Sequence, residues 1–203
     1  MTAAALTERR FGSRAALGAC VASIAYGVPQ VLQVIGWLPT PLDRYLIFAP
    51  SLALAPLFVV AMAAACAQAA PEHSARRLAA LALAVIYATQ VSSAYAIQLG
   101  SVLPREAAGQ VGSLGNVTCC TFRAPITTVD LLGYTHMCLS LLLLATTYRR
   151  GWLRWMLLAN GALAPALFLQ LFWPGLIYIG AIWLVVFPAA MALLARDLRG
   201  ARA

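Results

Sequence analysis

Six long apolar stretches, separated by short polar segments, dominate the pattern of hydrophobic positions along the chain. An α-helix needs about 20 predominantly apolar residues to cross the hydrocarbon core of a bilayer, and each stretch is long enough to do so. The pattern therefore predicts an all-α, polytopic membrane protein with six transmembrane helices. The expected spans are residues 15–38, 45–70, 78–103, 126–148, 155–173 and 175–195.

The segments between these spans are too short to form a second domain. The longest, residues 104–125, has 22 residues and cannot bury a core of its own. We therefore expect a single transmembrane domain over residues 1–203, with 104–125 as an outer loop. Prolines mark several expected helix ends, among them Pro39 and Pro41 after the first span and Pro104 at the end of the third.

Composition agrees with a membrane protein. Apolar residues make up 63% of the chain and charged residues only 10%, whereas about a quarter of a soluble domain is charged. The first apolar stretch has 24 residues, which is longer than the roughly 7 to 15 apolar residues of a signal peptide. It is therefore expected to be an uncleaved first span.

The arginines predict the orientation. All 14 basic residues are Arg, and the net charge is +8. Cytoplasmic loops of membrane proteins carry an excess of basic residues, so this distribution predicts that both termini are cytoplasmic. Eleven arginines fall on that side of a six-span arrangement, namely Arg9, Arg10, Arg14, Arg76, Arg77, Arg149, Arg150, Arg154, Arg196, Arg199 and Arg202.

The same distribution predicts the partners and the location. The charges are scattered over several membrane-proximal segments and form no basic surface module, which argues against nucleic-acid binding. The lipid bilayer is the expected partner, and the basic clusters are suited to its anionic headgroups. The use of Arg without Lys favours a bacterial gene, and hence a multi-pass protein of the cytoplasmic (inner) membrane.

Polar side chains within the spans are the candidate ligand-binding residues. Most of them fall in the outer half of the predicted bundle, which favours an outward-facing polar cavity. The alternative is that they only form hydrogen bonds between helices, worth on the order of 0.6 kcal/mol each. The candidates are Gln30, Gln33, Gln90, Gln98, Asp130, Tyr134, His136 and Gln170.

Asp130 and His136 carry the strongest chemistry, and they are expected on adjoining faces of the fourth span. A carboxylate inside a membrane is costly, so function is its default interpretation, although Asp130 lies near enough to the outer boundary to reach water or Arg123. His136 lies about ten residues inside the span, ~15 Å deep, where it could carry a proton, act as an acid or base, bind a haem or metal, or simply form a hydrogen bond as a neutral imidazole. No second ligand lies at metal-binding spacing, so no metal site is predicted, and no cofactor is indicated.

The cysteines and motifs narrow the possible chemistry. Cys119 and Cys120 form the only pair in the outer loop, and no Cys-x-x-Cys pair occurs, so thiol redox catalysis is not expected. The sequence contains no Gly-x-Ser-x-Gly, His-Glu-x-x-His or Walker motif. These absences disfavour common hydrolases and nucleotide-driven pumps but leave open an enzyme that acts on a lipid-soluble substrate.

Five short segments carry a family resemblance. They are Ala-Pro-Leu-Phe at 55–58, Ala-Ile-Gln-Leu at 96–99, Asp-Leu-Leu-Gly-Tyr at 130–134, Leu-Arg-Trp at 153–155 and Ala-Asn-Gly at 159–161. In their order the chain resembles a group of small bacterial six-span membrane proteins with no assigned activity. The resemblance implies the six-span architecture and no substrate.

Three function classes follow from these observations. The first is a protein that binds or transports a small or lipophilic molecule in an outward-facing polar cavity. The second is a membrane-embedded enzyme, such as an isomerase or cyclase, in which Asp130 or His136 donates a proton. The third is a structural scaffold that packs through the small residues Ala19, Ser23 and Gly27. The sequence leaves the oligomeric state open.

Overall fold

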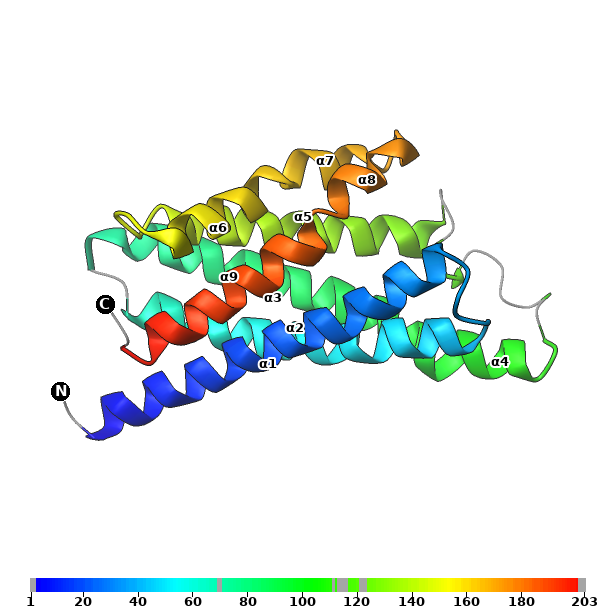
Figure 1. Cartoon of the computed structure of the whole chain (residues 1–203), viewed down its shortest axis with the longest axis horizontal. Coiled ribbons are helices and arrows are strands. Elements are labelled where there is room, and N and C mark those ends of the chain that lie inside the picture. The colour runs from blue at the N-terminus through cyan, green and yellow to red at the C-terminus, as the bar shows by residue number, and fades with distance from the viewer. Residues whose placement is uncertain (1–2, 69–70, 111, 113–116, 121–123, 201–203) are drawn as a thin grey trace.

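The described part of the chain is a bundle of helices. The computed structural model describes residues 3–68, 71–110, 112, 117–120 and 124–200, and these residues form helices and turns without a strand. The helices run lengthwise beside one another, and both chain ends lie at the same end of the bundle (Figure 1).

Six helical segments are long and apolar enough to cross a membrane, which confirms the predicted all-helical fold with six candidate spans. The first, second and fourth are the single helices α1 (Ala3–Val34), α2 (Leu42–Gln68) and α5 (Pro125–Ala145). The third is α3 (Ser74–Ile97), continued by a π-helical turn (Gln98–Val102) and by α4 (Leu103–Ala107). The fifth combines α6 (Trp152–Ala162) with α7 (Ala164–Leu169), and the sixth combines α8 (Ile177–Gly180) with α9 (Trp183–Leu198).

Two helix ends differ from those expected from proline. The first helix ends at Val34 rather than at Pro39, because Gly36 adopts a left-handed φ of 76° that stops the helix. The third span continues past Pro104, which lies in the first turn of α4, where a missing N–H breaks no hydrogen bond. The predicted outer loop therefore begins after Ala107.

Glycines let the helices approach closely. A Cβ on Gly133 of α5 would lie 2.7 Å from Val91 of α3, and a Cβ on Gly161 of α6 would lie 2.6 Å from Leu142 of α5. Small residues at helix contacts are typical of membrane bundles, where close packing drives association. These contacts fix the distance between α5 and its two neighbours, α3 and α6.

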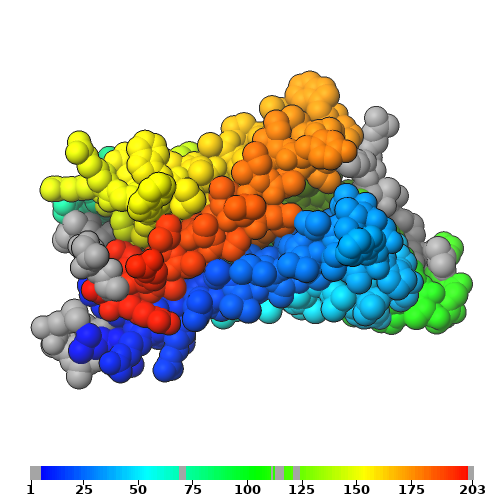
Figure 2. Space-filling model, viewed as in Figure 1, coloured from blue at the N-terminus to red at the C-terminus, as the bar shows by residue number. Residues whose placement is uncertain are grey.

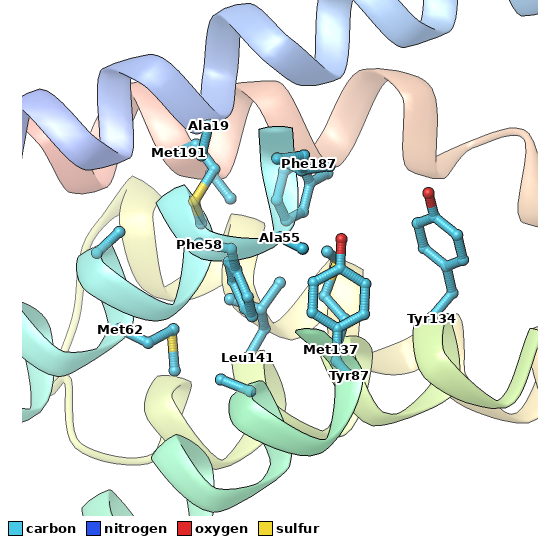
Figure 3. Packing of buried hydrophobic residues seen from close by; sticks show 14 of the residues in the cluster. Ala19, Ala55, Phe58, Met62, Tyr87, Tyr134, Met137, Leu141, Phe187 and Met191 are labelled. Carbon is cyan, nitrogen blue, oxygen red and sulfur yellow. The ribbon is translucent and has the colours of Figure 1, made fainter. Parts of the chain in front are cut away.

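The centre of the bundle is filled with apolar side chains, and Figure 3 shows members of this core from α1, α2, α3, α5 and α9. The ring of Phe58 on α2 lies 5.5 Å from that of Tyr87 on α3 and 5.8 Å from that of Phe187 on α9, measured between centroids. Met137 of α5 is fully buried in the same core. The core therefore links α2, α3, α5 and α9, and its aromatic part continues toward Tyr134.

The fifth and sixth spans are both interrupted. The fifth breaks at Leu163, just before Pro165 of α7, and the sixth breaks between Gly180 and Trp183. The broken segments pack on one another, because a Cβ on Gly180 would lie 3.2 Å from Leu167. Interrupted helices leave backbone groups free at membrane depth, and in transporters they mark binding sites.

Candidate functional site

A buried carboxyl group surrounded by aromatic side chains is the most unusual feature of the bundle. Asp130 and Tyr134 lie one helical turn apart on α5, and Tyr87 and Tyr95 lie about two turns apart on α3, so each pair shares a face. The break in the sixth span makes Trp183 the first residue of α9. We refer to the following residues as the Asp130 cluster: Asp130, Tyr26, Tyr87, Tyr95, Tyr134 and Trp183.

The rings of the cluster form a continuous series across the bundle. The centroid of Trp183 lies 5.3 Å from that of Tyr134 and 5.9 Å from that of Tyr26, with interplanar angles of 83° and 78°. The rings of Tyr87 and Tyr134 are 5.7 Å apart. Edge-to-face packing of this kind is favourable, so the rings hold α1, α3, α5 and α9 in a fixed arrangement around Asp130.

Hydroxyl groups connect the cluster. The hydroxyls of Tyr95 and Tyr134 are 3.3 Å apart. Tyr134 lies one helical turn from Asp130 on α5. The contact between the two hydroxyls therefore joins α3 to the face of α5 that carries the carboxyl group.

Three other polar atoms of the cluster are buried without a hydrogen-bond partner in the described part of the chain. They are Oδ1 of Asp130, the hydroxyl of Tyr87 and Nε1 of Trp183. Figure 3 shows the hydroxyls of Tyr87 and Tyr134 pointing the same way, toward α1 and α9. Burying a polar group without a partner costs about 1–3 kcal/mol, so three such atoms together indicate a place for water or a ligand.

Asp130 also lacks a counter-charge among the described residues. Its side chain is only 8% exposed, and the salt bridge in the described part of the chain joins Arg44 to Glu106. Arg123, the partner considered from the sequence, lies outside the described residues. A buried carboxyl group of this kind is stable only with a proton or a cation bound to it.

The structure places His136 and Gln90 away from this cluster. His136 Nδ1 lies 2.8 Å from Gln90 Oε1, and both side chains are half-buried at the outer surface of the α3–α5 contact. His136 follows Tyr134 by two residues, which is about 200° around a helix, so the two side chains lie on opposite faces. The contact with Gln90 therefore turns His136 away from the face of α5 that carries Tyr134.

Gln30 and Gln33 belong to a second polar group, where α1 ends and α2 begins. Gln33 Nε2 donates to Asp43 Oδ2 at 2.6 Å, and Gln30 Nε2 lies 3.5 Å from Gln33 Oε1. Thr40 also lies 3.4 Å from the same carboxylate oxygen. Gln33 and Thr40 therefore flank the carboxylate of Asp43. Asp43 was not a candidate from the sequence, because it lies between the predicted spans.

Gln98 holds the outer loop. Its Nε2 donates to the carbonyl of Val117 at 2.7 Å, and its Oε1 accepts from the backbone N–H of Cys119 at 2.9 Å. Hydrogen bonding with Cys120 and burial raise the pKa of the Cys119 thiol above its ordinary value. Since the thiolate is the reactive form of cysteine, this geometry makes Cys119 a poor nucleophile.

Gln170 is buried at the contact between the broken spans, where a Cβ on Gly180 would lie 3.3 Å from its Oε1. Of the eight candidates, Asp130 and Tyr134 are thus brought together, and the other six lie in separate polar groups. Tyr95 and Trp183 were not among the candidates. Tyr95 could have been identified from the sequence, because it lies about two helical turns from Tyr87 on the same face.

No family model, curated protein or solved structure matches the chain. The resemblance to small six-span bacterial proteins therefore stays a prediction. The function has to be argued from the site itself.

Proposed function

We propose that the chain is a multi-pass protein of the bacterial inner membrane that binds a small organic cation at the Asp130 cluster. The observation that carries the proposal is a buried carboxyl group with no counter-charge among the described residues and with aromatic rings around it. A ligand that is positively charged and partly apolar matches both properties.

Aromatic rings add to the attraction of the carboxylate. A cation over the face of Trp or Tyr, within about 6 Å of the ring centroid, gains roughly 2 kcal/mol when the site is dry. Tyr134 and Trp183 are both buried, the latter with 4% of its side chain exposed. The rings therefore favour an alkylammonium ion over a fully hydrated metal ion, because the carbon atoms of the alkylammonium ion replace water at the ring faces.

The edge of the site lies between α1 and α8. Tyr26 is the half-buried member of the cluster, and one residue further along α1 a Cβ on Gly27 would lie 3.2 Å from Leu184 of α9. Beyond this close contact, α1 and α8 diverge toward the end of the bundle opposite the chain termini (Figure 1). Because Tyr26 is more exposed than Trp183, it is the ring that a ligand reaching the cluster from this side would contact first.

The arginine distribution supports an outward-facing site. Eleven of the 14 arginines fall at the end that holds both termini, which the positive-inside rule assigns to the cytoplasm. The divergent ends of α1 and α8 then face the outside. The protein therefore receives its ligand from the periplasm or cell exterior.

One observation favours a second function, that of a membrane-embedded isomerase or cyclase. The hydroxyls of Tyr95 and Tyr134 lie 3.3 Å apart, and Asp130 lies one helical turn from Tyr134 on α5, an arrangement suited to proton delivery. Aromatic faces that bind an ammonium ion also stabilise a carbocation formed when an alkene is protonated. An enzyme of this class would convert a lipid-soluble alkene on incubation, whereas a binding protein would return it unchanged.

A matched pair of ligands tests the cation proposal. The purified protein in a nonionic detergent is titrated with a benzyltrimethylammonium salt and with its neutral isostere, neopentylbenzene, and binding is followed by native mass spectrometry. We expect the cation to bind at least tenfold more tightly, because about 1.4 kcal/mol corresponds to a factor of ten. Equal affinities would contradict the proposal, and binding of neither compound would favour the scaffold.

A further inference from the structure

A cavity lined with arginine lies at the other end of the bundle, between the first turns of α1 and Arg199, the residue after α9. Its volume is about 450 Å³, within the range of roughly 300–1,000 Å³ that is typical of ligand pockets. Figure 2 shows the start of α1 in blue against the end of α9 in red at this end. The residues that line the cavity are Leu6, Arg9, Arg10, Arg14 and Arg199.

One wall of this cavity is held in place by a buried serine. Ser13 of α1 is 1% exposed and donates its hydroxyl to the carbonyl of Ala195 on α9 at 2.8 Å. Arg199 Nε in turn donates to Ser13 Oγ at 2.8 Å. The guanidinium group of Arg199 is thereby fixed across the α1–α9 contact, and within the described ranges no hydrogen bond occupies its two terminal nitrogens.

The residues that line the cavity carry a net positive charge. Four of the five lining residues are arginines, and none is acidic. Asp197, the acid nearest in sequence to Arg199, accepts a hydrogen bond from Tyr148. Arg10 and Arg14 are four residues apart on α1, a spacing at which like charges repel. An anion in the cavity would relieve this repulsion.

We propose that this cavity binds the phosphate of an anionic phospholipid headgroup. Arg9, Arg10 and Arg14 lie in the first turns of the span Leu6–Val34, and Arg199 follows directly on the span that ends at Leu198. This is the level at which headgroups meet a bilayer-spanning helix. Guanidinium groups bind phosphate through paired hydrogen bonds.

This inference is independent of the organic-cation site and of which membrane face holds the termini. Lipid retention by the purified, full-length protein in a nonionic detergent tests it. Phosphatidylglycerol and phosphatidylcholine with the same acyl chains are offered in equal amounts, and bound lipid is counted by native mass spectrometry. We expect retention of phosphatidylglycerol over phosphatidylcholine and a higher melting temperature with the anionic lipid.

Two variants separate the cavity from general surface charge. Arg9→Gln combined with Arg199→Gln is expected to lower phosphatidylglycerol retention at least tenfold. Arg150→Gln removes an exposed arginine of the same membrane end that does not line the cavity, and it is expected to leave retention unchanged. Equal losses in the two proteins, or equal retention of the two lipids, would overturn the proposal.

Inorganic phosphate forms the third arm of the experiment, because it presents the same oxygen atoms without a lipid. Millimolar phosphate is expected to compete weakly with phosphatidylglycerol. Full stabilisation by phosphate alone, with no gain from the lipid, would overturn the lipid assignment. Circular dichroism of each variant confirms that the helices are intact before binding is compared.

Discussion

Asp130→Asn is expected to weaken the binding of a benzyltrimethylammonium ion by about a hundredfold. Asn keeps the shape of the side chain and removes the charge that the ligand balances. Truncating one partner of a buried charge pair costs about 2–5 kcal/mol, and about 2.8 kcal/mol corresponds to a factor of 100. Titration followed by native mass spectrometry gives the affinity, and a thermal melt of the same sample shows whether the bundle is intact.

Asp43→Asn is the matched control for this substitution. Asp43 is also a buried acid with one unpartnered oxygen, but it is not part of the aromatic cluster, and its Oδ2 accepts from Gln33 at 2.6 Å and lies 3.4 Å from Thr40. Its replacement is expected to lower the melting temperature and to leave cation affinity unchanged. If both variants lost affinity to the same degree, the loss would reflect general damage to the outer end, and the assignment of Asp130 would fail.

Gly161→Leu is expected to cause the largest loss of stability. A Cβ on Gly161 would lie 2.6 Å from the Cβ of Leu142 and 3.0 Å from its Cα. These two atoms of Leu142 cannot rotate away, because one belongs to the backbone and the other is the first atom of the side chain. Helix α6 must therefore separate from α5. Overpacking of this kind costs about 1–3 kcal/mol and sometimes more. A lower melting temperature in detergent, with earlier loss of helical signal, measures the effect.

Gly175→Leu provides the comparison for this prediction. A Cβ on Gly175 meets no atom within 4 Å, and its backbone needs no left-handed conformation. The added side chain is therefore expected to change the melting temperature by less than a degree or two. Equal melting temperatures for the two leucine variants would show that the α5–α6 contact is looser than the close approach of Gly161 indicates.

The sequence predicted the spans because the bilayer imposes a single strong requirement, a long apolar helix. It did not predict the break in the sixth span, since no proline lies between Gly180 and Trp183. At that break the chain packs against α7, where Gly180 meets Leu167. Interruptions caused by contacts between spans leave no local signal in the residues that adopt them.

The sequence predicted how deep the polar residues lie in the bundle, but not which of them face one another. Asp130 and Tyr134 were identified because a carboxyl group and a phenol one turn apart stand out in an apolar helix. His136 was grouped with them by depth, although an angle of about 200° from Tyr134 turns it toward Gln90. Tyr95 and Trp183 join Asp130 only through the packing of α3 and α9 on α5, which a single sequence does not reveal.

The position of the bound cation tests the central claim most directly. Intact cells that produce the protein are exposed to a membrane-impermeant, photoreactive quaternary ammonium compound, irradiated, and analysed by mass spectrometry of the labelled peptides. The account predicts labelling of α5 near Asp130 and Tyr134 and of Trp183 on α9, suppressed by excess benzyltrimethylammonium. Labelling only at the arginine-lined end, or only in inside-out vesicles, would contradict it.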